Sequence, residues 1–239
     1  MEQYAIIVAG GSGSRMQSKV PKQFLEIEGK PILMHTLMRF FEAVPNIKII
    51  TVLPPQEIET WKFLCKKHEF SVPHQVVGGG STRFHSVKNG LAVCPHEGLV
   101  AIHDGVRPFV SKRAIIESFE VAQSKGNAVL SVPLKDSLRF KHQNGATQAV
   151  NRSAYVAVQT PQTFQLSIIK PCFESPYQEF FTDDATVAEY HGIPIYLIEG
   201  DEENIKITTP LDKLWAEVYL KSKRISQENN LQRAGDSNP

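Results

Sequence analysis

The sequence predicts an α/β protein with a mostly parallel, twisted sheet and helices on both of its faces. Short apolar runs typical of buried strands alternate with amphipathic stretches of helical length, and parallel strands need such crossover helices. The expected helices begin at residues that favour a helix start, namely Pro31, Pro55 and Ser111. Gly126 favours the position just after the last turn of a helix. The length of 239 residues fits one domain of this kind with an embellishment.

Taken in chain order, strands and helices alternate regularly up to residue 132. The expected strands are the apolar runs 4–9 (YAIIVA), 47–53, 74–77, 98–103 and 127–132. The amphipathic stretches between them are the expected helices 31–43, 55–68, 81–93, with Ser81 as its N-cap, and 111–126. After an irregular stretch the pattern resumes, with helices at 165–174, 183–191 and 210–222 and a strand at 194–198.

The alternation breaks in the stretch 133–158. Asn144 and Gly145 form a turn signal there between polar, alternating flanks, which predicts a hairpin. Its faces have no obvious partner within the chain, so we expect a protruding arm that packs on a second subunit of a homodimer. Residues 1–223 are expected to form one domain with this arm, and the polar stretch 224–239 a disordered tail.

Composition narrows the class of function. A net charge of +1 argues against a general binder of nucleic acids or of membrane surfaces, which would carry a basic excess, yet it leaves room for a local basic pocket. Three scattered cysteines indicate no disulfide framework and a reducing compartment. No stretch resembles a signal peptide or a membrane span, so the cytoplasm is the expected location.

The loop AGGSGSRM (9–16) follows the first expected strand and has the composition of a phosphate-binding loop. Its glycines let the backbone approach a ligand, and successive amide groups can bind an anion. It is neither a dinucleotide fingerprint, because Met16 occupies the third glycine position, nor a Walker A loop. Arg15 and Lys22 would repel one another without an anion between them, although both could instead be solvated surface charges.

Three further loops follow expected strands, at the sheet edge where open α/β proteins bind ligands. VGGGSTRFHS (77–86) would allow close approach of a flat ligand such as a base, or serve as a flexible linker. Asp104 is placed for Mg²⁺ or a ribose hydroxyl, and Arg107 could meet a phosphate or simply pair with Asp104. Lys206 lies in a short extended run whose alternation points it to a cleft or to water.

The chemistry of these loops favours one reaction class. His103 is expected in the core rather than in catalysis, and no arrangement of Ser, His and Asp or of Cys and His suggests a protein nucleophile. Glycine loops, cations and one aspartate are typical of phosphoryl or nucleotidyl transfer, in which the protein positions groups and neutralises developing charge.

Eight motifs in a fixed order make a family resemblance specific. Over roughly residues 3–222 the chain resembles the 2-C-methyl-D-erythritol 4-phosphate cytidylyltransferases in AGGSGSRM…VPKQF, GGGSTRFHSV, HDGVRPF, VPLKDSL, NRS, TPQTF, TDDAT and NIKITTP. The resemblance implies a Rossmann-like nucleotidyltransferase fold and a homodimer joined by a β-arm. It also implies transfer of CMP from CTP to methylerythritol phosphate, with Mg²⁺ or another divalent cation, in the non-mevalonate route to isoprenoids.

The resemblance further implies roles for individual residues. The transition state at the α-phosphate would be stabilised by Arg15 and Lys22. CTP would be bound by Ala9, Gly10, Gly11, Gly13, Gly80, Ser86 and Asp104, the last also near the metal. The acceptor would be held by Arg107, Ser137, Arg152, Thr160 and Lys206, with Ser137 and Arg152 supplied across the dimer. Val106 stands where the family usually has Ala and could crowd the pocket slightly.

Two other functions stay open on the residues alone. The ribitol 5-phosphate cytidylyltransferases share the CTP loops and NIKITTP, although VPLKDSL and NRS favour the methylerythritol branch. The second alternative is a non-catalytic nucleotide-sensing module on the same fold. The pair Arg15 and Lys22 speaks against it, because a sensor needs no transition-state cations.

Overall fold

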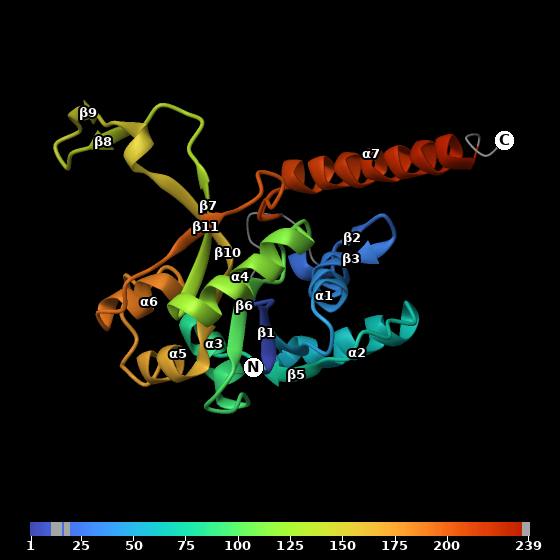
Figure 1. Cartoon of the computed structure of the whole chain (residues 1–239), viewed down its shortest axis with the longest axis horizontal. Coiled ribbons are helices and arrows are strands. Elements are labelled where there is room, and N and C mark those ends of the chain that lie inside the picture. The colour runs from blue at the N-terminus through green and yellow to red at the C-terminus, as the bar shows by residue number, and fades with distance from the viewer. Residues whose placement is uncertain (11–15, 17–19, 236–239) are drawn as a thin grey trace.

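The centre of the structure is a seven-stranded sheet with the order β11-β7-β10-β6-β1-β4-β5 (Figure 1). The computed structural model describes residues 1–10, 16 and 20–235, and only the main chain of 226–235. The strands of the sheet are β1 (Gln3–Val8), β4 (Lys48–Leu53), β5 (Gln75–Gly78), β6 (Leu99–Asp104), β7 (Asn127–Pro133), β10 (Val156–Gln165) and β11 (Leu197–Glu199). Every neighbouring pair in this sheet except those of β10 is parallel, which confirms the predicted, mostly parallel sheet.

Helices cover both faces of the sheet, as the sequence predicts. On one face α1 (Ile32–Ala43), α2 (Ile58–Lys67) and α4 (Lys112–Lys125) pack on alternate strand residues such as Ala5. On the other face α3 (Arg83–Ala92), α5 (Leu166–Cys172) and α6 (Asp184–Tyr190) pack on the residues between, such as Ile6. Because both faces are buried, the parallel strands at the centre of the sheet, such as β1 and β6, are apolar along most of their length. Polar side chains such as Asp104 lie at their ends.

Helix boundaries follow mostly from local sequence. The Ser111 hydroxyl caps α4 by accepting a main-chain N–H of the first turn at 3.1 Å, and Gly126 follows the helix with a φ of 95°. Helix α3 is capped by Thr82 rather than by Ser81, because Thr82 Oγ1 accepts the N–H of His85 at 3.3 Å. Ser81 therefore belongs to the glycine-rich loop before the helix.

Strand β10 is the strand of the central sheet that the sequence does not predict. It lies between β6 and β7 and is antiparallel to both, so the predicted arm 133–158 ends inside the central sheet. The sequence does not show the pattern of a buried strand here, because Pro161 is disfavoured within a central strand and its neighbours are polar. In the structure the pairing register shifts between Val158 and Gln162, and this irregularity accommodates the proline.

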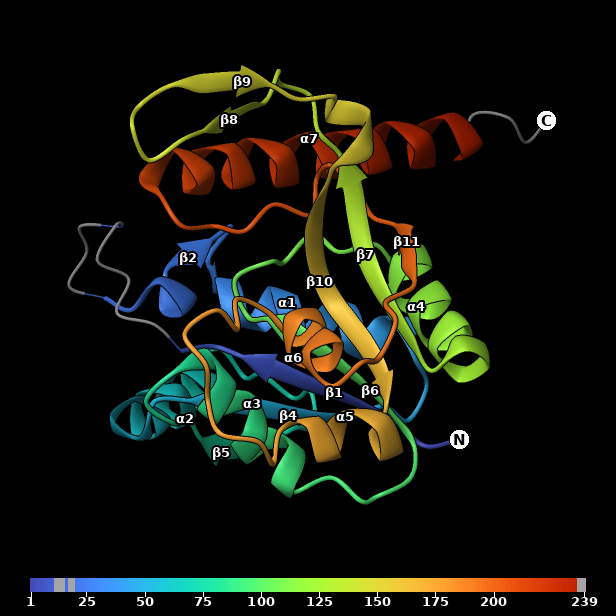
Figure 2. The same cartoon turned by 90° about the vertical axis from the view of Figure 1, so that its left-hand side faces the viewer.

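The arm between β7 and β10 contains the predicted hairpin. Strands β8 (Arg139–Lys141) and β9 (Thr147–Ala149) are antiparallel, and the His142 N–H donates to Ala146 O at 2.8 Å across the turn. Gly145 has a φ of +86°, which glycine adopts without strain. Figures 1 and 2 show the arm projecting beyond the ends of β7 and β10, and all residues of its two strands are exposed.

Helix α7 (Pro210–Gly235) is longer than the sequence predicts. The sequence predicts a helix to 222 and a disordered tail at 224–239, whereas the helix continues to Gly235 and projects from the body of the protein (Figure 1). The rest of the predicted tail, 236–239, lies outside the described residues. Gln, Glu, Leu and Arg in this stretch favour helix, so a helix begun in the packed part can propagate. None of the helices in the described ranges carries an apolar stretch long enough to cross a membrane.

Candidate active site

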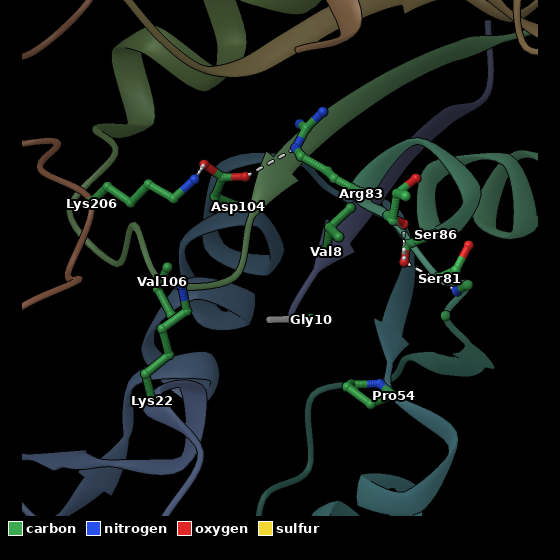
Figure 3. Close-up of a pocket in the computed structure, with 13 residues that line it drawn as sticks. Val8, Gly10, Lys22, Pro54, Ser81, Arg83, Ser86, Asp104, Val106 and Lys206 are labelled. Carbon is green, nitrogen blue, oxygen red and sulfur yellow. Dashed lines mark hydrogen bonds and ion pairs between the residues drawn. The ribbon is translucent and has the colours of Figure 1, made fainter. Parts of the chain in front are cut away.

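A pocket with a volume of about 280 Å³ lies at the carboxyl ends of the central parallel strands, where open α/β sheets bind ligands. All four loops that the sequence predicts to bind ligand contribute to it, and Figure 3 shows their side chains converging on the pocket. The residues that line it are Val8, Gly10, Lys22, Pro54, Gly79, Gly80, Ser81, Thr82, Arg83, Ser86, Asp104, Val106 and Lys206.

The glycine-rich loop after β5 forms one wall of the pocket. The Gly80 N–H donates to Ser86 Oγ at 3.1 Å, and the Ser86 hydroxyl donates to Thr82 O at 3.0 Å, so Ser86 fixes the loop against the start of α3. A Cβ added to Gly80 would lie 2.4 Å from Cβ of His85, a contact that only glycine avoids. The loop therefore presents mainly its backbone to a ligand.

Asp104, the last residue of β6, is the centre of charge in the pocket. Only 6% of it is exposed, and its carboxylate oxygens lie 2.8 Å from Lys206 Nζ, 3.4 Å from Arg83 Nε and 3.5 Å from Arg107 Nε. Burial alone would raise the pKa of Asp104, but these three cations outweigh it and hold the pKa well below its ordinary value. Arg83 is also paired with a second carboxylate, Asp184, so the three cations face two carboxylates. The remaining positive charge suits a phosphate ligand.

Arg83 lines the pocket and is not among the residues predicted from the sequence. Its Nη1 and Nη2 donate to the two carboxylate oxygens of Asp184 at 2.8 and 2.7 Å, and Asp184 is fully buried at the start of α6. Burial opposes the charged guanidinium, but the carboxylates of Asp184 and Asp104 raise the pKa of Arg83 above its ordinary value. A cation in the first turn of a helix opposes the helix dipole, and this mismatch is a sequence signal for an acidic partner.

Lys22 begins the short 3₁₀ helix η2 (Lys22–Phe24) and lines the pocket. Its neighbours Gln23 and Phe24 are buried, and the Phe24 ring stacks on Trp61 of α2 with 5.9 Å between ring centroids. This anchoring fixes the main chain from which Lys22 extends, and Figure 3 shows the side chain among those at the pocket. Three predicted phosphate contacts lie outside the described residues, namely Gly11, Gly13 and Arg15.

Two predicted CTP contacts in the first loop differ in position. Gly10 lines the pocket, and a Cβ there would meet no atom of the described residues within 4 Å. Ala9 does not line the pocket, because it continues β1 and its N–H donates to Val52 O of β4 at 2.9 Å. Val106 lines the pocket and is only 4% exposed, and it belongs to a hydrophobic cluster with Phe109 and Ile207. That it crowds the pocket stays a prediction.

The residues predicted to hold the acceptor fall into two groups. Arg107 and Lys206 contact Asp104 directly. Thr160 is buried and lies behind Asp104, whose N–H donates to Thr160 Oγ1 at 3.1 Å. Arg107 and Lys206 therefore meet at the Asp104 carboxylate, and Thr160 holds the main chain of the same residue.

The second group lies in the arm. Ser137 and Arg152 are exposed and do not line the pocket of their own chain. The Arg152 guanidinium donates to Lys135 O, within the arm itself. The structure thus brings together the predicted CTP loops and part of the predicted acceptor site, and it leaves these two residues apart.

His103 is a core residue, as the sequence predicts. It is fully buried, its Nε2–H donates to Arg107 O at 3.0 Å, and its ring packs edge-on against Phe40 at 4.9 Å. Burial lowers the pKa of His103 to about 4, so the ring is neutral at neutral pH. It holds the turn that carries Asp104 and Arg107.

Known proteins resemble this chain over most of its length. The family model for 2-C-methyl-D-erythritol 4-phosphate cytidylyltransferase matches residues 3–222. Proteins with this name from Porphyromonas gingivalis and Bacteroides thetaiotaomicron are 51% identical over 225 residues (93% of this chain, 100% of the relative) and 49% identical over 212 residues (89% and 96%). A crystal structure of 4-diphosphocytidyl-2C-methyl-D-erythritol synthase from Anaerococcus prevotii has a TM-score of 0.79 at 29% identity, covering 92% of this chain and 96% of that one. The corresponding Thermus thermophilus cytidylyltransferase gives 0.73 at 29% identity, covering 92% and 100%.

Proposed function

The chain belongs to the 2-C-methyl-D-erythritol 4-phosphate cytidylyltransferase family, and from this premise we propose that the pocket around Asp104 is its active site. As a member of this family it is a nucleotidyltransferase of the non-mevalonate isoprenoid route. It transfers CMP from CTP to 2-C-methyl-D-erythritol 4-phosphate, giving 4-diphosphocytidyl-2-C-methyl-D-erythritol and pyrophosphate. The observation that best supports the assignment of the site is the convergence of four separate loops on one basic pocket.

CTP is proposed to bind across the two glycine loops. The backbone around Gly80, which lines the pocket and is fixed by Ser86, would receive the cytosine. The part of the pocket beside Gly10 and the cation Lys22 would receive the triphosphate. The predicted contacts Gly11, Gly13 and Arg15 would complete this loop, whereas Ala9 supports it from the end of strand β1.

In the proposed reaction an acceptor phosphate oxygen attacks the α-phosphorus of CTP in line, and pyrophosphate leaves. Lys22 and Arg15 meet the negative charge that grows on the α-phosphate oxygens. Preorganised charges of this kind stabilise a transition state because they need not reorient during the reaction. Arg107 and Lys206 would exchange the Asp104 carboxylate for the acceptor's phosphate, with Thr160 supporting Asp104 from behind.

We propose that a divalent cation binds at Asp104. Mg²⁺ suits this site because it prefers oxygen ligands such as a carboxylate. Among the described residues no group of three or more His, Cys, Asp or Glu side chains could hold a metal by itself. A single carboxylate suits Mg²⁺, which proteins usually bind through one or two carboxylates together with substrate phosphates. When bound, the ion would neutralise charge on the triphosphate.

The acceptor site is proposed to be completed by a second copy of the chain. Ser137 and Arg152 are exposed and do not line the pocket of their own chain, which is expected if the 133–158 arm reaches a partner. Phe140 and Tyr155 in the arm are 56% and 49% exposed, and burial of such aromatic surface would stabilise a homodimer. We propose the cytoplasm as the location, because all three cysteines are free thiols.

Release of pyrophosphate tests this assignment. The purified protein is incubated with CTP, Mg²⁺ and either methylerythritol phosphate or ribitol 5-phosphate. We expect kcat/KM to be on the order of a hundredfold higher with methylerythritol phosphate, because the rejected acceptor leaves buried polar groups unpaired. Preference for ribitol 5-phosphate would move the chain to that branch. Binding of CTP without turnover of either acceptor would favour the sensing module.

A further inference from the structure

We propose that Asn204 is a positioning residue that anchors the pocket segment 204–206 to strand β10, so that Lys206 reaches the acceptor's phosphate. The inference rests on the proposed function, because it takes Lys206 as a ligand of that phosphate. Lys206 has a long side chain, 39% exposed, in a segment without regular secondary structure. The reach of such a side chain depends on how firmly its main chain is held.

Asn204 is polar and yet fully buried. Its Nδ2 donates to the main-chain oxygen of Thr160 at 2.8 Å and to Gln159 Oε1 at 3.2 Å. Gln159 is 6% exposed, and its Nε2 donates to Asp201 O at 2.8 Å. Buried hydrogen bonds of this kind are directional and costly to break, so the turn before Lys206 is fastened to β10 at two points.

The irregularity of β10 makes these contacts available. The pairing of β10 with β7 shifts between Val158 and Gln162, so Gln159 and Thr160 lie in the interruption and can bond to the neighbouring segment instead. Thr160 also accepts the N–H of Asp104 through its hydroxyl at 3.1 Å. One short stretch of β10 therefore supports both the central carboxylate and the lysine that faces it.

Contacts on the opposite side complete the placement of the segment. Arg107 Nη1 donates to Asn204 O at 2.7 Å, and the Ile207 N–H donates to Val106 O at 2.9 Å. Lys206 is thereby held with its Nζ 2.8 Å from Asp104. Removal of the Asn204 side chain would delete its two bonds to β10. The bonds of Gln159 to Asp201 and the main-chain bonds of Asn204 and Ile207 would stay in place.

A matched control exists at the other end of the sheet. Asn127 is 1% exposed at the start of β7, donates to Pro194 O at 2.9 Å and accepts the N–H of Tyr196 at 2.9 Å. It also anchors a distant segment through a buried amide, but at the amino edge of the strands. Asn127→Ala therefore reports the effect of losing such an anchor away from the pocket.

The experiment compares Asn204→Ala, Lys206→Ala, their double variant and Asn127→Ala. For each we measure kcat/KM for methylerythritol phosphate at saturating CTP, the Kd for CTP alone, and the melting temperature. Asn204→Ala should lower kcat/KM about tenfold to a hundredfold, because a small misplacement of a contacting group has effects of this size. The Kd for CTP should stay within about twofold of wild type, and Asn127→Ala should leave kcat/KM within about twofold at a similar loss of melting temperature.

The double variant gives the decisive comparison. If Asn204 acts through Lys206, Asn204→Ala should lower kcat/KM less than about threefold when Lys206 is already alanine. Three results would each overturn the inference. The first is a loss of kcat/KM in the double variant equal to the product of the two single losses. The others are an equal loss of kcat/KM in Asn127→Ala and a wild-type kcat/KM in Asn204→Ala. A normal kcat/KM in Lys206→Ala would instead overturn the proposed role of Lys206, and the inference with it. If Asn204→Ala does not fold, Gln159→Ala, which removes the other side chain of the anchor, undergoes the same measurements with the same criteria.

Discussion

The pocket around Asp104 and the β8–β9 arm differ in how their polar side chains are held. Asp104 is 6% exposed among three cations, and Asp184 is fully buried against Arg83. In the arm, the strand residues are exposed, and the ion pair Lys135–Glu202 joins the arm to the body with side chains 72% and 62% exposed. The charges of the pocket are thus paired within the fold before a ligand arrives, whereas the strands of the arm are left exposed. Under the proposed function, one chain builds the nucleotide half of the site and leaves the acceptor half to be completed.

The largest effect is expected from breaking the buried ion pair. Asp184→Asn keeps the side-chain shape and removes the charge that compensates Arg83, so the free energy of unfolding should fall by about 3–5 kcal/mol. Urea denaturation measures this loss. Lys135→Ala is the matched change in the arm, and it should leave the denaturation midpoint nearly unchanged because its ion pair is solvated. Equal losses in the two variants would erase the difference between the regions.

The next effect tests the catalytic half of the pocket. Lys22→Ala should lower kcat about 100- to 1,000-fold with little change in the Kd for CTP, because the charge is needed chiefly in the transition state. Steady-state pyrophosphate release and calorimetry measure the two quantities. Lys30→Ala, an exposed lysine of the nearby strand β3 (Lys30–Pro31), should retain wild-type kcat. A near-normal kcat in Lys22→Ala would contradict the assigned role.

A smaller effect should appear as a pH dependence of stability. His103 is kept neutral in the fold, with its pKa lowered from 6.5 to about 4, whereas the unfolded chain takes up a proton below pH 6.5. The unfolded state then binds more protons, so stability is lost as pH falls, by about 2 kcal/mol between pH 7 and 5. Denaturation of wild type and His103→Gln at both pH values measures this contribution as the difference between their slopes. Parallel slopes would show that His103 is not held neutral.

The smallest effect is expected in the arm. Arg152→Ala should lower kcat/KM for the acceptor about tenfold, because one charged contact to the phosphate is lost, and should leave the Kd for CTP unchanged. Arg139→Ala is the matched control, since Arg139 donates to Thr147 Oγ1 at 2.8 Å within the hairpin.

Mixing two variants tests whether the arm crosses between subunits. Arg152→Ala and Lys22→Ala subunits mixed in equal amounts should recover about a quarter of wild-type activity, because half of the dimers then contain one intact site of two. No recovery after subunit exchange would indicate a site built within one chain.

Much of the fold could be read from local patterns. The order of strands and helices before residue 132 follows from apolar periodicity, and the helix ends at Ser111 and Gly126 follow from capping chemistry. The positions of Gly80, Asp104 and Lys206 follow from the same pattern, because loops after parallel strands meet at one edge of the sheet. The extension of α7 to Gly235 was less accessible, since polar composition alone does not separate a solvated helix from a disordered segment.

The sequence by itself determined the alternation of elements, the loops that carry the ligand-binding residues and the hairpin turn at Gly145, because each depends on residues close together in the chain. Only the tertiary structure decided three other features. Strand β10 is part of the sheet despite Pro161, because β6 and β7 pair with it on both sides. Arg83 bonds to Asp184, which lies 101 residues away in the sequence, and Asn204 bonds to Thr160, which lies 44 residues away. Such pairs carry no local periodicity, because buried charges and amides are satisfied by whichever groups the packed fold brings within hydrogen-bonding distance.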